Sequence, residues 1–270
     1  MVDLSCVILT WNSEKYIEKC LTSLAKDLTD FAISYELFVI DNGSTDSTLE
    51  ALRRLEAAGL SLTVIPLCSN TGTTFSRNIG LKMARGKYVC VLDSDIELHE
   101  PGTVEHLINT LENNPSSGIV APMLRYPSGN LQKSVDKFPT IVTKINRLFF
   151  LKQMEKRKEL VPDTVVEVDY AISAFWVFRR TLIDAVGLLD TRIFYSPEDV
   201  DYCLRCWLNG FSVLYDTHRC AIHHAQEISR KSPFSKAARS HLKGLFYLYR
   251  KHGYMFSLKP LYERIAQLRK

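Results

Sequence analysis

Two aspartates separated by one serine follow directly on a run of apolar residues. The run is Tyr88 to Leu92, and the acids are Asp93 and Asp95. A run of this length fits a strand buried in a parallel sheet, and α/β proteins bind ligands at the carboxyl edge of such sheets. Two carboxylates at that edge suit a hard divalent cation, which is commonly shared with substrate phosphates. The motif therefore indicates a metal site that holds a nucleotide diphosphate.

A second pair with the same spacing, Asp199 and Asp201, shows that the spacing alone is a weak signal in a chain with 30 acids. With Glu198, these acids begin a periodic apolar segment that ends at 209–210, so they are expected in the first turn of a helix. The helix dipole stabilises acids there, which is a structural alternative to catalysis. Adjacent positions of a helix do not share a face, so Glu198 and Asp199 are not expected to enter one pocket in the same way.

The composition is that of a globular protein. The chain has 270 residues, of which 46% are hydrophobic and 24% are charged, enough for one large α/β domain or a domain with an appended subdomain. The cysteine count is odd, at 7, and several cysteines lie in apolar runs, which favours a reducing compartment. There is no leader-like start and no stretch of about 18 apolar residues. We therefore expect a cytoplasmic protein without a membrane span.

The net charge of +4 is unevenly distributed. From Arg230 onward there are eleven basic residues and one acid, Glu263, so the tail carries +10 and the remainder −6. Apolar residues alternate with these cations, which indicates an amphipathic helix. Such a helix could pack on the core, or it could rest on an anionic bilayer at the inner face of the plasma membrane. Both alternatives stay open, and no nucleic-acid partner is expected.

Strand and helix patterns alternate in the first half. Strands are expected at 4–9, 36–40, 62–67 and 88–92, and helices at 13–25 (capped by Asn12 or Ser13), 49–55, 75–84 and 104–111. This alternation predicts an α/β fold with a mostly parallel, doubly wound sheet flanked by helices. The second half is less regular. It holds a strand at 119–124, a charged mobile loop or short helix at 152–160, an apolar stretch at 171–178 and a short helix at 181–186.

An ordered set of motifs resembles the family-two glycosyltransferases of the GT-A fold. The motifs are Val7–Asn12, Val39–Asp46, Asn70–Gly72, Ser76–Gly80 and Val91–Asp95. Downstream, 169–180, 194–205 and 222–224 are similar to the rhamnosyltransferase-like branch. The resemblance covers roughly 4–252, and its specificity rests on the order of the motifs rather than on any one of them.

The resemblance implies a catalytic domain over 1–229 and a basic amphipathic helical tail over 230–270. Within the catalytic domain, about 1–97 would bind the nucleotide and about 98–229 would form the acceptor side.

The resemblance also implies a nucleotide site at the ends of the first strands. Asp41 would accept a hydrogen bond from the imide N–H of uracil or thymine, with Thr10 and Trp11 beside the base. As an alternative, Asp41 could cap its own turn, although Asp46 is better placed to cap the following helix. Arg77 would approach the nucleotide near the metal, or it would be an exposed helix charge. The remaining nucleotide contacts would come from Asn12, Asn70, Asp93 and Ser94.

By the same resemblance, Asp93 and Asp95 would hold Mg²⁺ or Mn²⁺, with His223 as a further ligand. Imidazole slightly favours manganese. Because side chains alternate along an extended segment, at most one of His223 and His224 can face the site. His223 is the one we expect there.

The resemblance places the catalytic base, which takes the proton of the acceptor hydroxyl, at Asp199, with Glu198 as second choice. Asp201 would be a supporting or helix-capping acid. One base on one face implies displacement with inversion and without a covalent intermediate.

The sequence thus predicts metal-dependent transfer of a sugar from a UDP- or dTDP-sugar donor to a glycan or lipid-linked acceptor in cell-surface polysaccharide synthesis. Two other classes stay open. A sugar nucleotidyltransferase is expected to show a glycine-rich, basic phosphate loop near the N-terminus, and 9–12 has none. A catalytically silent nucleotide-binding protein on the same scaffold is disfavoured because Asp93, Asp95 and Asp199 are all present.

Overall fold

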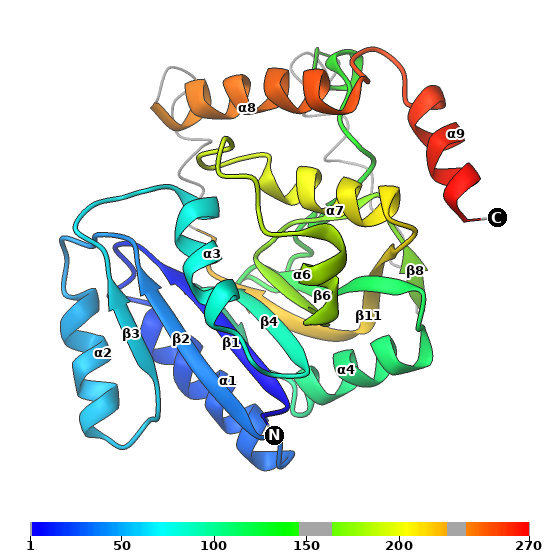
Figure 1. Cartoon of the computed structure of the whole chain (residues 1–270). Helices are drawn as coiled ribbons and strands as arrows, with labels where there is room; N and C mark the ends of the chain where they lie inside the picture. The colour runs from blue at the N-terminus through cyan, green and yellow to red at the C-terminus, as the bar shows by residue number, and fades with distance from the viewer. Residues whose placement is uncertain (1, 146–163, 226–235, 270) are drawn as a thin grey trace.

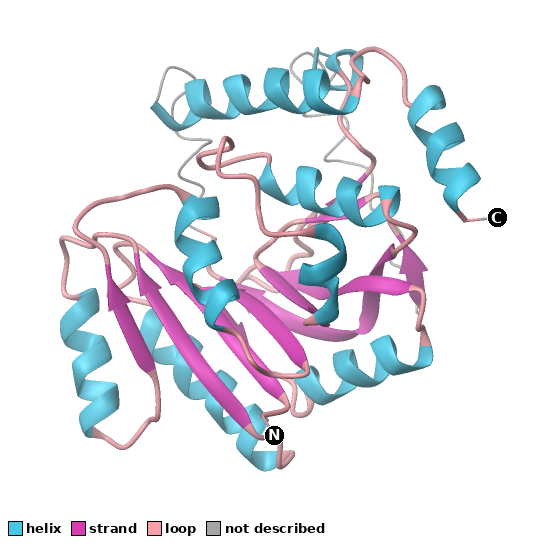
Figure 2. Ribbon diagram, viewed as in Figure 1, coloured by secondary structure: helices cyan, strands magenta, loops and turns pink. Residues whose placement is uncertain are grey.

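The structure is a computed structural model that describes residues 2–145, 164–225 and 236–269. A twisted sheet forms its centre, helices cover both faces of the sheet, and two further helices lie over one side (Figures 1 and 2). The charged segment expected at 152–160 lies outside the described residues.

The first half forms the parallel part of the sheet. Its strands are β1 (Leu4–Thr10), β2 (Tyr35–Asp41), β3 (Thr63–Pro66) and β4 (Tyr88–Asp93), in the order β3-β2-β1-β4. They alternate with α1 (Ile17–Asp30), α2 (Thr48–Ala57) and α3 (Thr73–Met83), as the sequence pattern predicts. Thr10 pairs with Asp41 and Leu9 with Asp93. The register therefore brings the last residues of β1, β2 and β4 to one edge of the sheet.

The second half makes the sheet mixed. β10 (Phe175–Arg179) lies antiparallel between β4 and β6 (Ser117–Arg125), and β11 (Ser212–His223) runs parallel to β6. β5 (Ile96–Leu98) and β8 (Val165–Glu167) pair antiparallel with β11. The apolar stretch expected at 171–178 is divided, because β9 (Tyr170–Ala171) pairs with β7 (Val135–Asp136) in a separate sheet. This half also contains α4 (Thr103–Asn113), α6 (Thr181–Val186) and α7 (Glu198–Leu208).

Side-chain alternation along the strands produces two apolar layers. Leu4, Cys6 and Ile8 of β1 join a buried cluster with α1, α2 and α4. Val7 points to the opposite face and joins a second cluster with α3, α6 and α7. A sheet that is covered on both faces has continuously apolar strands, which explains the unbroken apolar runs in the sequence.

The start of α1 differs from the prediction. The helix begins at Ile17, after a turn in which the Ser13 carbonyl accepts hydrogen bonds from the backbone N–H groups of Tyr16 and Ile17. Neither predicted side chain caps it. Asn12 Oδ1 accepts from the Thr45 N–H at 2.8 Å, and the Ser13 hydroxyl lies 2.7 Å from that of Ser94. Both side chains connect loops at the sheet edge instead, and sequence spacing could not show these long-range partners.

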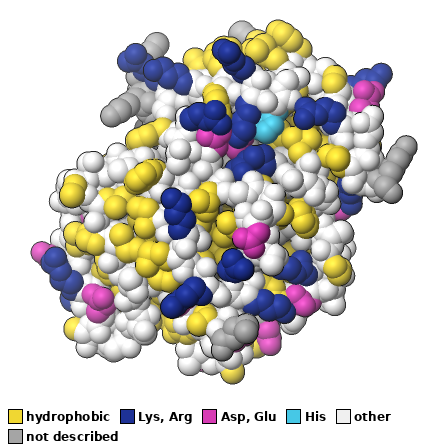
Figure 3. All heavy atoms as spheres, viewed as in Figure 1, with side chains coloured by type: hydrophobic (Ala, Val, Ile, Leu, Met, Phe, Trp, Pro, Cys, Tyr) yellow, Lys and Arg dark blue, Asp and Glu magenta, His cyan; other side chains and the backbone are white. Residues whose placement is uncertain are grey.

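The basic tail forms α8 (Lys236–His252) and α9 (Lys259–Leu268), which lie over α7. Leu245, Leu248 and Tyr249 are buried in the same apolar cluster as α6 and α7, whereas Leu242 and Phe246 are exposed. Lys and Arg side chains gather with hydrophobic ones along this upper side of the molecule (Figure 3). Of the two alternatives for the tail, packing on the core is therefore observed. Contact of its exposed face with a membrane stays a prediction.

Over the described residues, every helix is too short or too polar to span a bilayer.

Gly244 of α8 packs closely against the loop that precedes α7. A Cβ atom added there would lie 2.4 Å from the backbone oxygen of Ser196 and 2.8 Å from Pro197 Cδ. We expect Gly244→Ala to lower the free energy of unfolding by about 2 kcal/mol, because overpacking costs about 1–3 kcal/mol and exceeds the helix-propensity gain. Urea denaturation measures it. Exposed Lys243→Ala is the control and should stay within about 0.5 kcal/mol; a more stable Gly244→Ala protein would contradict the close packing.

Candidate active site

A cavity of about 1020 Å³ lies at the sheet edge where β1, β2 and β4 end, and α7 and α8 form its opposite side. Most of the predicted site residues line it, although they come from distant parts of the chain. They are Trp11, Asn70, Arg77, Asp93, Ser94, Asp95, Glu198, Asp199 and His223. Thr10, Asn12 and Asp41 are not among the lining residues. The edge of the sheet and the N-terminus of α7 thus face one another across a single space.

Asp93, Asp95 and His223 form a compact group in this cavity. One ligand atom from each lies within 4.8 Å of the other two, and His223 Nε2 is 3.2 Å from Asp95 Oδ1. The antiparallel pairing of β5 with β11 places His223 opposite Ile96, directly after the acids. His224 points away and lies 2.9 Å from Glu97. Alternation along β11 therefore selects His223 as the histidine of the site.

The donor set fits a divalent cation. Gln132 Oε1 lies 2.8 Å from Nδ1 of His223. Nδ1 can donate this hydrogen bond, and Nε2 then faces Asp95, whose charge outweighs burial and raises the pKa of His223. A cation at Nε2 would take the place of a proton there. Burial and the neighbouring charge of Asp95 raise the pKa of Asp93, and Arg77 offsets only part of this rise. A cation between the two carboxylates would relieve their repulsion.

Arg77 connects the two sides of the cavity. Its guanidinium is buried and forms an ion pair with Asp93 at the end of β4. It also donates to the Ser173 hydroxyl at 2.5 Å and to the Ser173 carbonyl at 3.1 Å, and it lies 3.5 Å from Glu198 Oε1. The alternative of an exposed helix charge is therefore wrong. The ion pair with Arg77 uses Oδ1 of Asp93, so the second carboxylate oxygen of Asp93 is left for a metal.

Glu198 and Asp199 both line the cavity but differ in surroundings. Burial and the neighbouring Asp199 raise the pKa of Glu198 to about 8, and the charge of Arg77 offsets only part of this rise. Burial raises the pKa of Asp199 only to about 6, because the Val200 N–H, at 2.7 Å, and the charge of Lys144 stabilise its carboxylate. The pKa of Glu198 is thus raised more than that of Asp199, so Asp199 is the carboxyl of the pair that ionises more readily. A general base acts in its ionised form, which favours Asp199.

The remaining predicted nucleotide residues order the loops beside the cavity. Asp41 is buried and accepts hydrogen bonds from the backbone N–H and the hydroxyl of Ser44, so it does cap its turn. Asp46 accepts from the Thr48 N–H at 3.0 Å, as expected for a residue that caps α2. The Thr10 hydroxyl is buried without a hydrogen-bond partner in the described structure. Contact of Asp41 and Thr10 with a base stays a prediction.

Several residues of the site escaped the sequence analysis. They are Asn42, Gly72, Gln132, Lys144 and Ser173. Asn42 had a signal, because it lies within the 41–46 turn; its side chain bonds Asn70 and Thr71. Gly72 and Ser173 also lie within motifs, Asn70–Gly72 and 169–180, but no role was assigned to them. Gln132 lies in none of the motifs, and only the folded chain shows that Gln132 contacts His223 and that Ser173 contacts Arg77.

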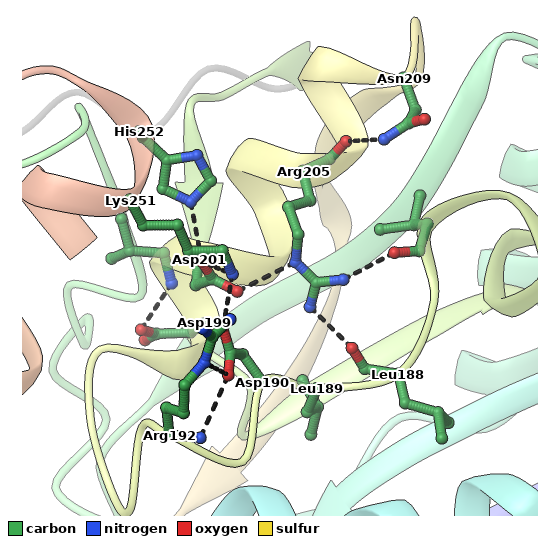
Figure 4. A network of polar contacts seen from close by, with 12 residues as sticks. Leu188, Leu189, Asp190, Arg192, Asp199, Asp201, Arg205, Asn209, Lys251 and His252 are labelled. Carbon is green, nitrogen blue, oxygen red and sulfur yellow. Dashed lines mark hydrogen bonds and ion pairs between the residues drawn. The ribbon is translucent and has the colours of Figure 1, made fainter. Parts of the chain in front are cut away.

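Asp201 joins α7 to the tail rather than capping the helix. Oδ1 of this buried carboxylate lies 2.7 Å from Lys251 Nζ and 2.8 Å from His252 Nε2, and Oδ2 lies 3.0 Å from Arg205 Nε (Figure 4). Lys251 also contacts Asp190 at 2.8 Å. Although burial raises the pKa of Asp201, its hydrogen bonds and these cations outweigh that effect and lower it. The expectation of a capping acid is wrong, and a supporting role remains.

Comparison with known proteins defines the class. The sequence model of Glycosyl transferase family 2 matches residues 5–187, more than half of the chain. The chain therefore belongs to this family, and the prediction made from the motif order is confirmed.

Relatives and solved structures agree with this class. The chain is 27% identical over 223 residues to the poly(ribitol-phosphate) beta-N-acetylglucosaminyltransferase TarS of Staphylococcus aureus, covering 80% of this chain but 35% of that protein. It is 24% identical to the N-acetylglucosaminyl-diphospho-decaprenol L-rhamnosyltransferase of Mycobacterium tuberculosis, covering 93% of this chain and 85% of that one. The chain thus spans about a third of the length of TarS.

The fold is also that of a mannosyltransferase from Pyrobaculum calidifontis, solved in complex with GDP-Man and Mn²⁺. The TM-score is 0.65 and the identity 20%, and the match covers 98% of this chain and 69% of that one. The predicted fold class is thereby confirmed.

Asp201 gives a stability prediction. Asp201→Asn should lower the free energy of unfolding at pH 7 by about 3 kcal/mol, because it leaves partly buried cations unpaired. Since the folded pKa of Asp201 is lowered, its stabilisation is complete above the unfolded pKa of about 4 and is lost as the pH falls through the folded value. Denaturation of both proteins between pH 7 and pH 3 should show the difference shrinking below about pH 4. Asp30→Asn, which breaks an exposed pair with Lys26, should change stability by less than about 0.5 kcal/mol; an equal effect of both changes would contradict the buried network.

Proposed function

We propose that the chain is a metal-dependent inverting glycosyltransferase that uses a UDP- or dTDP-sugar donor and a glycan or lipid-linked acceptor in cell-surface polysaccharide synthesis. One observation carries the proposal. Asp93, Asp95 and His223 line the same cavity as Asp199, although about a hundred positions of sequence separate the two groups of acids. Donor and acceptor can therefore meet between a metal group and a base.

The donor diphosphate lies, in this proposal, against Asp93, Asp95 and His223. A divalent cation bound there, Mn²⁺ or Mg²⁺, would neutralise charge on the departing diphosphate. Trp11 lines the cavity at the end of β1, where the base is expected, and Asn70 lies on the loop that Asn42 holds. The neighbour solved with a nucleotide sugar and Mn²⁺ supports this class of ligand.

Asp199 takes the proton of the acceptor hydroxyl while the hydroxyl oxygen forms a bond to the anomeric carbon. The bond from that carbon to the diphosphate oxygen breaks at the same time, and its electron pair leaves with the diphosphate. Attack from the face opposite the leaving group inverts the configuration. Glu198 remains protonated near neutral pH, because its pKa lies near 8; it therefore positions Arg77 and Ser173 rather than acting as the base.

The proposed domains correspond to the donor side and the acceptor side of the cavity. We propose that about 1–97 binds the nucleotide, that about 98–229 forms the acceptor side, and that the tail over 230–270 completes this side through α8. Arg239 and Lys243 of α8 line the cavity beside Asp199. The acceptor would be reached in the cytoplasm, at the inner face of the plasma membrane.

Donor binding is the first test. Calorimetric titration with UDP and dTDP should show nucleotide binding that strengthens at least tenfold with Mn²⁺, and Asp95→Ala should remove this dependence, since typical losses of a metal contact are 10–100-fold. Glu97→Gln is the matched control, because Glu97 bonds His224, which points away from the metal group. Equal binding with and without metal would contradict the site. Metal-dependent binding with no turnover across a panel of nucleotide sugars would favour a silent binding protein, and release of pyrophosphate from a sugar phosphate and a nucleoside triphosphate would favour a nucleotidyltransferase.

The base assignment is tested by two neighbouring variants. Asp199→Asn should lower kcat by about 10²–10⁴-fold with little change in donor affinity, because general-base catalysis contributes about that much. Glu198→Gln replaces a carboxyl that is already neutral near pH 7, so its loss of kcat should be less than about tenfold. The reverse order of effects would make Glu198 the base.

The pH profile gives the same assignment independently. Because Asp199 acts in its ionised form and its pKa is raised to about 6, kcat/KM should rise with pH through about 6 and then level off. The residual activity of Asp199→Asn should lack this rise.

A further inference from the structure

Two histidines and a buried aspartate form a compact group away from the cavity. His106 lies on α4, and Asp216 and His218 lie on β11. His106 Nε2 is 3.0 Å from Asp216 Oδ2, and His218 Nδ1 is 3.0 Å from Asp216 Oδ1. One ligand atom from each residue lies within 4.8 Å of the other two. None of the three residues lines the cavity of the proposed active site.

A bulge in β11 builds this group. Asp216 pairs with Pro122 of β6, and Cys220 pairs with the next residue, Met123, so 217–219 bulge out of the ladder. Proline has no N–H to donate to a ladder, and bulges re-aim the side chains around them. The bulge turns the ring of His218 back toward Asp216, whose oxygen also accepts from the His218 backbone N–H at 3.0 Å. The position of His218 is therefore fixed by backbone geometry.

The other half of the group comes from one face of α4. His106 and Thr110 are four residues apart, so both point at β11. The Thr110 hydroxyl donates to Asp216 Oδ2 at 2.6 Å. This bond orients the carboxylate, as partners outside a metal's ligand shell commonly do. The side chains of His106 and His218 are 30% and 40% exposed, whereas Asp216 is fully buried. An ion can thus reach the two imidazoles from solvent and find the carboxylate already positioned beneath them.

We propose that His106, Asp216 and His218 bind one zinc-type divalent ion, with a fourth position open to water. Two imidazoles and one carboxylate are a common zinc donor set, with bonds of about 2.0–2.2 Å. To bind a shared ion, His106 Nε2 and His218 Nδ1, which face Asp216, would turn toward it. A proton on either nitrogen would be released to solvent or carried by the other nitrogen of the same ring. The ion would join α4 to β11 and stabilise the face of the sheet opposite α7.

The two groups of possible metal ligands found among the described residues differ in chemical preference. Asp93, Asp95 and His223 offer two carboxylates and one imidazole, which suits Mg²⁺ or Mn²⁺ shared with a diphosphate. His106, Asp216 and His218 offer two imidazoles, which shifts preference toward zinc and cobalt. Excess Mg²⁺ should therefore occupy the first group and leave the second group to zinc.

The test is equilibrium dialysis of the untagged full chain against Zn²⁺ in the presence of excess Mg²⁺. The matched variants are His106→Gln and His218→Asn, whose amide N–H groups can still donate to Asp216 but which are poor zinc ligands. We expect the wild type to bind one equivalent of zinc that each variant loses, with affinity falling more than about 100-fold. Zinc should also raise the Tm of the wild type and not that of the variants. Equal zinc binding by the wild type and both variants would overturn the proposal.

Two further variants test whether the zinc binds at another place in the protein. Asp95→Ala removes the cavity group and Cys68→Ser removes the exposed cysteine; both should retain the equivalent of zinc. Loss of that zinc in either variant would overturn the proposal, because it would place the ion at the cavity or on the thiol. In a second dialysis without Mg²⁺, a failure of the proposed cavity site would show in Asp95→Ala alone. The zinc binding of the His106 and His218 variants does not depend on that site, so it tests this proposal separately from the proposed function.

Discussion

The buried guanidinium of Arg77 is the interaction on which the candidate site depends. It is almost completely removed from solvent and touches Asp93 on one side and Ser173 and Glu198 on the other. A buried charge is tolerated only when its partners are in place. Arg77 therefore requires the end of β4, the β9–β10 connection and the N-terminus of α7 to come together. The same closure also affects the acids of the site, because burial and the neighbouring Asp199 raise the pKa of Glu198 and Arg77 offsets only part of this rise.

The parallel half of the fold could be read from the sequence, because local patterns determine it. Apolar runs that end in Thr10, Asp41 and Asp93 indicate buried strands whose carboxyl ends meet at one edge, and the structure has this register. The predicted donor set of Asp93, Asp95 and His223 also came together. Topology was enough to place Asp93 and Asp95, because they lie at and just after the end of a strand, whereas His223 was chosen through the resemblance to the glycosyltransferase family.

The other contacts of the site and the mixed half of the sheet could not be predicted from the sequence, because they depend on contacts between distant segments. Gln132 lies outside every motif and Ser173 lies in one without an assigned role, yet the first contacts His223 and the second shares Arg77 with Asp93. Asp201 fitted the pattern of a helix-capping acid, and only the packing of α8 shows that its partners are Lys251 and His252. The antiparallel insertion of β10 likewise follows from its tertiary pairing with β4 on one side and β6 on the other rather than from local alternation.

The link between Asp201 and the tail has an evolutionary consequence. A mutation that removed this acid would leave Lys251 and His252 without their partner on α7, and a mutation that removed those two side chains would leave the buried acid without them. Each step alone is costly, so replacement should proceed through paired changes. Positions 201, 251 and 252 should therefore covary among relatives, and lineages that lose the final helices should carry an uncharged residue two places after the proposed base.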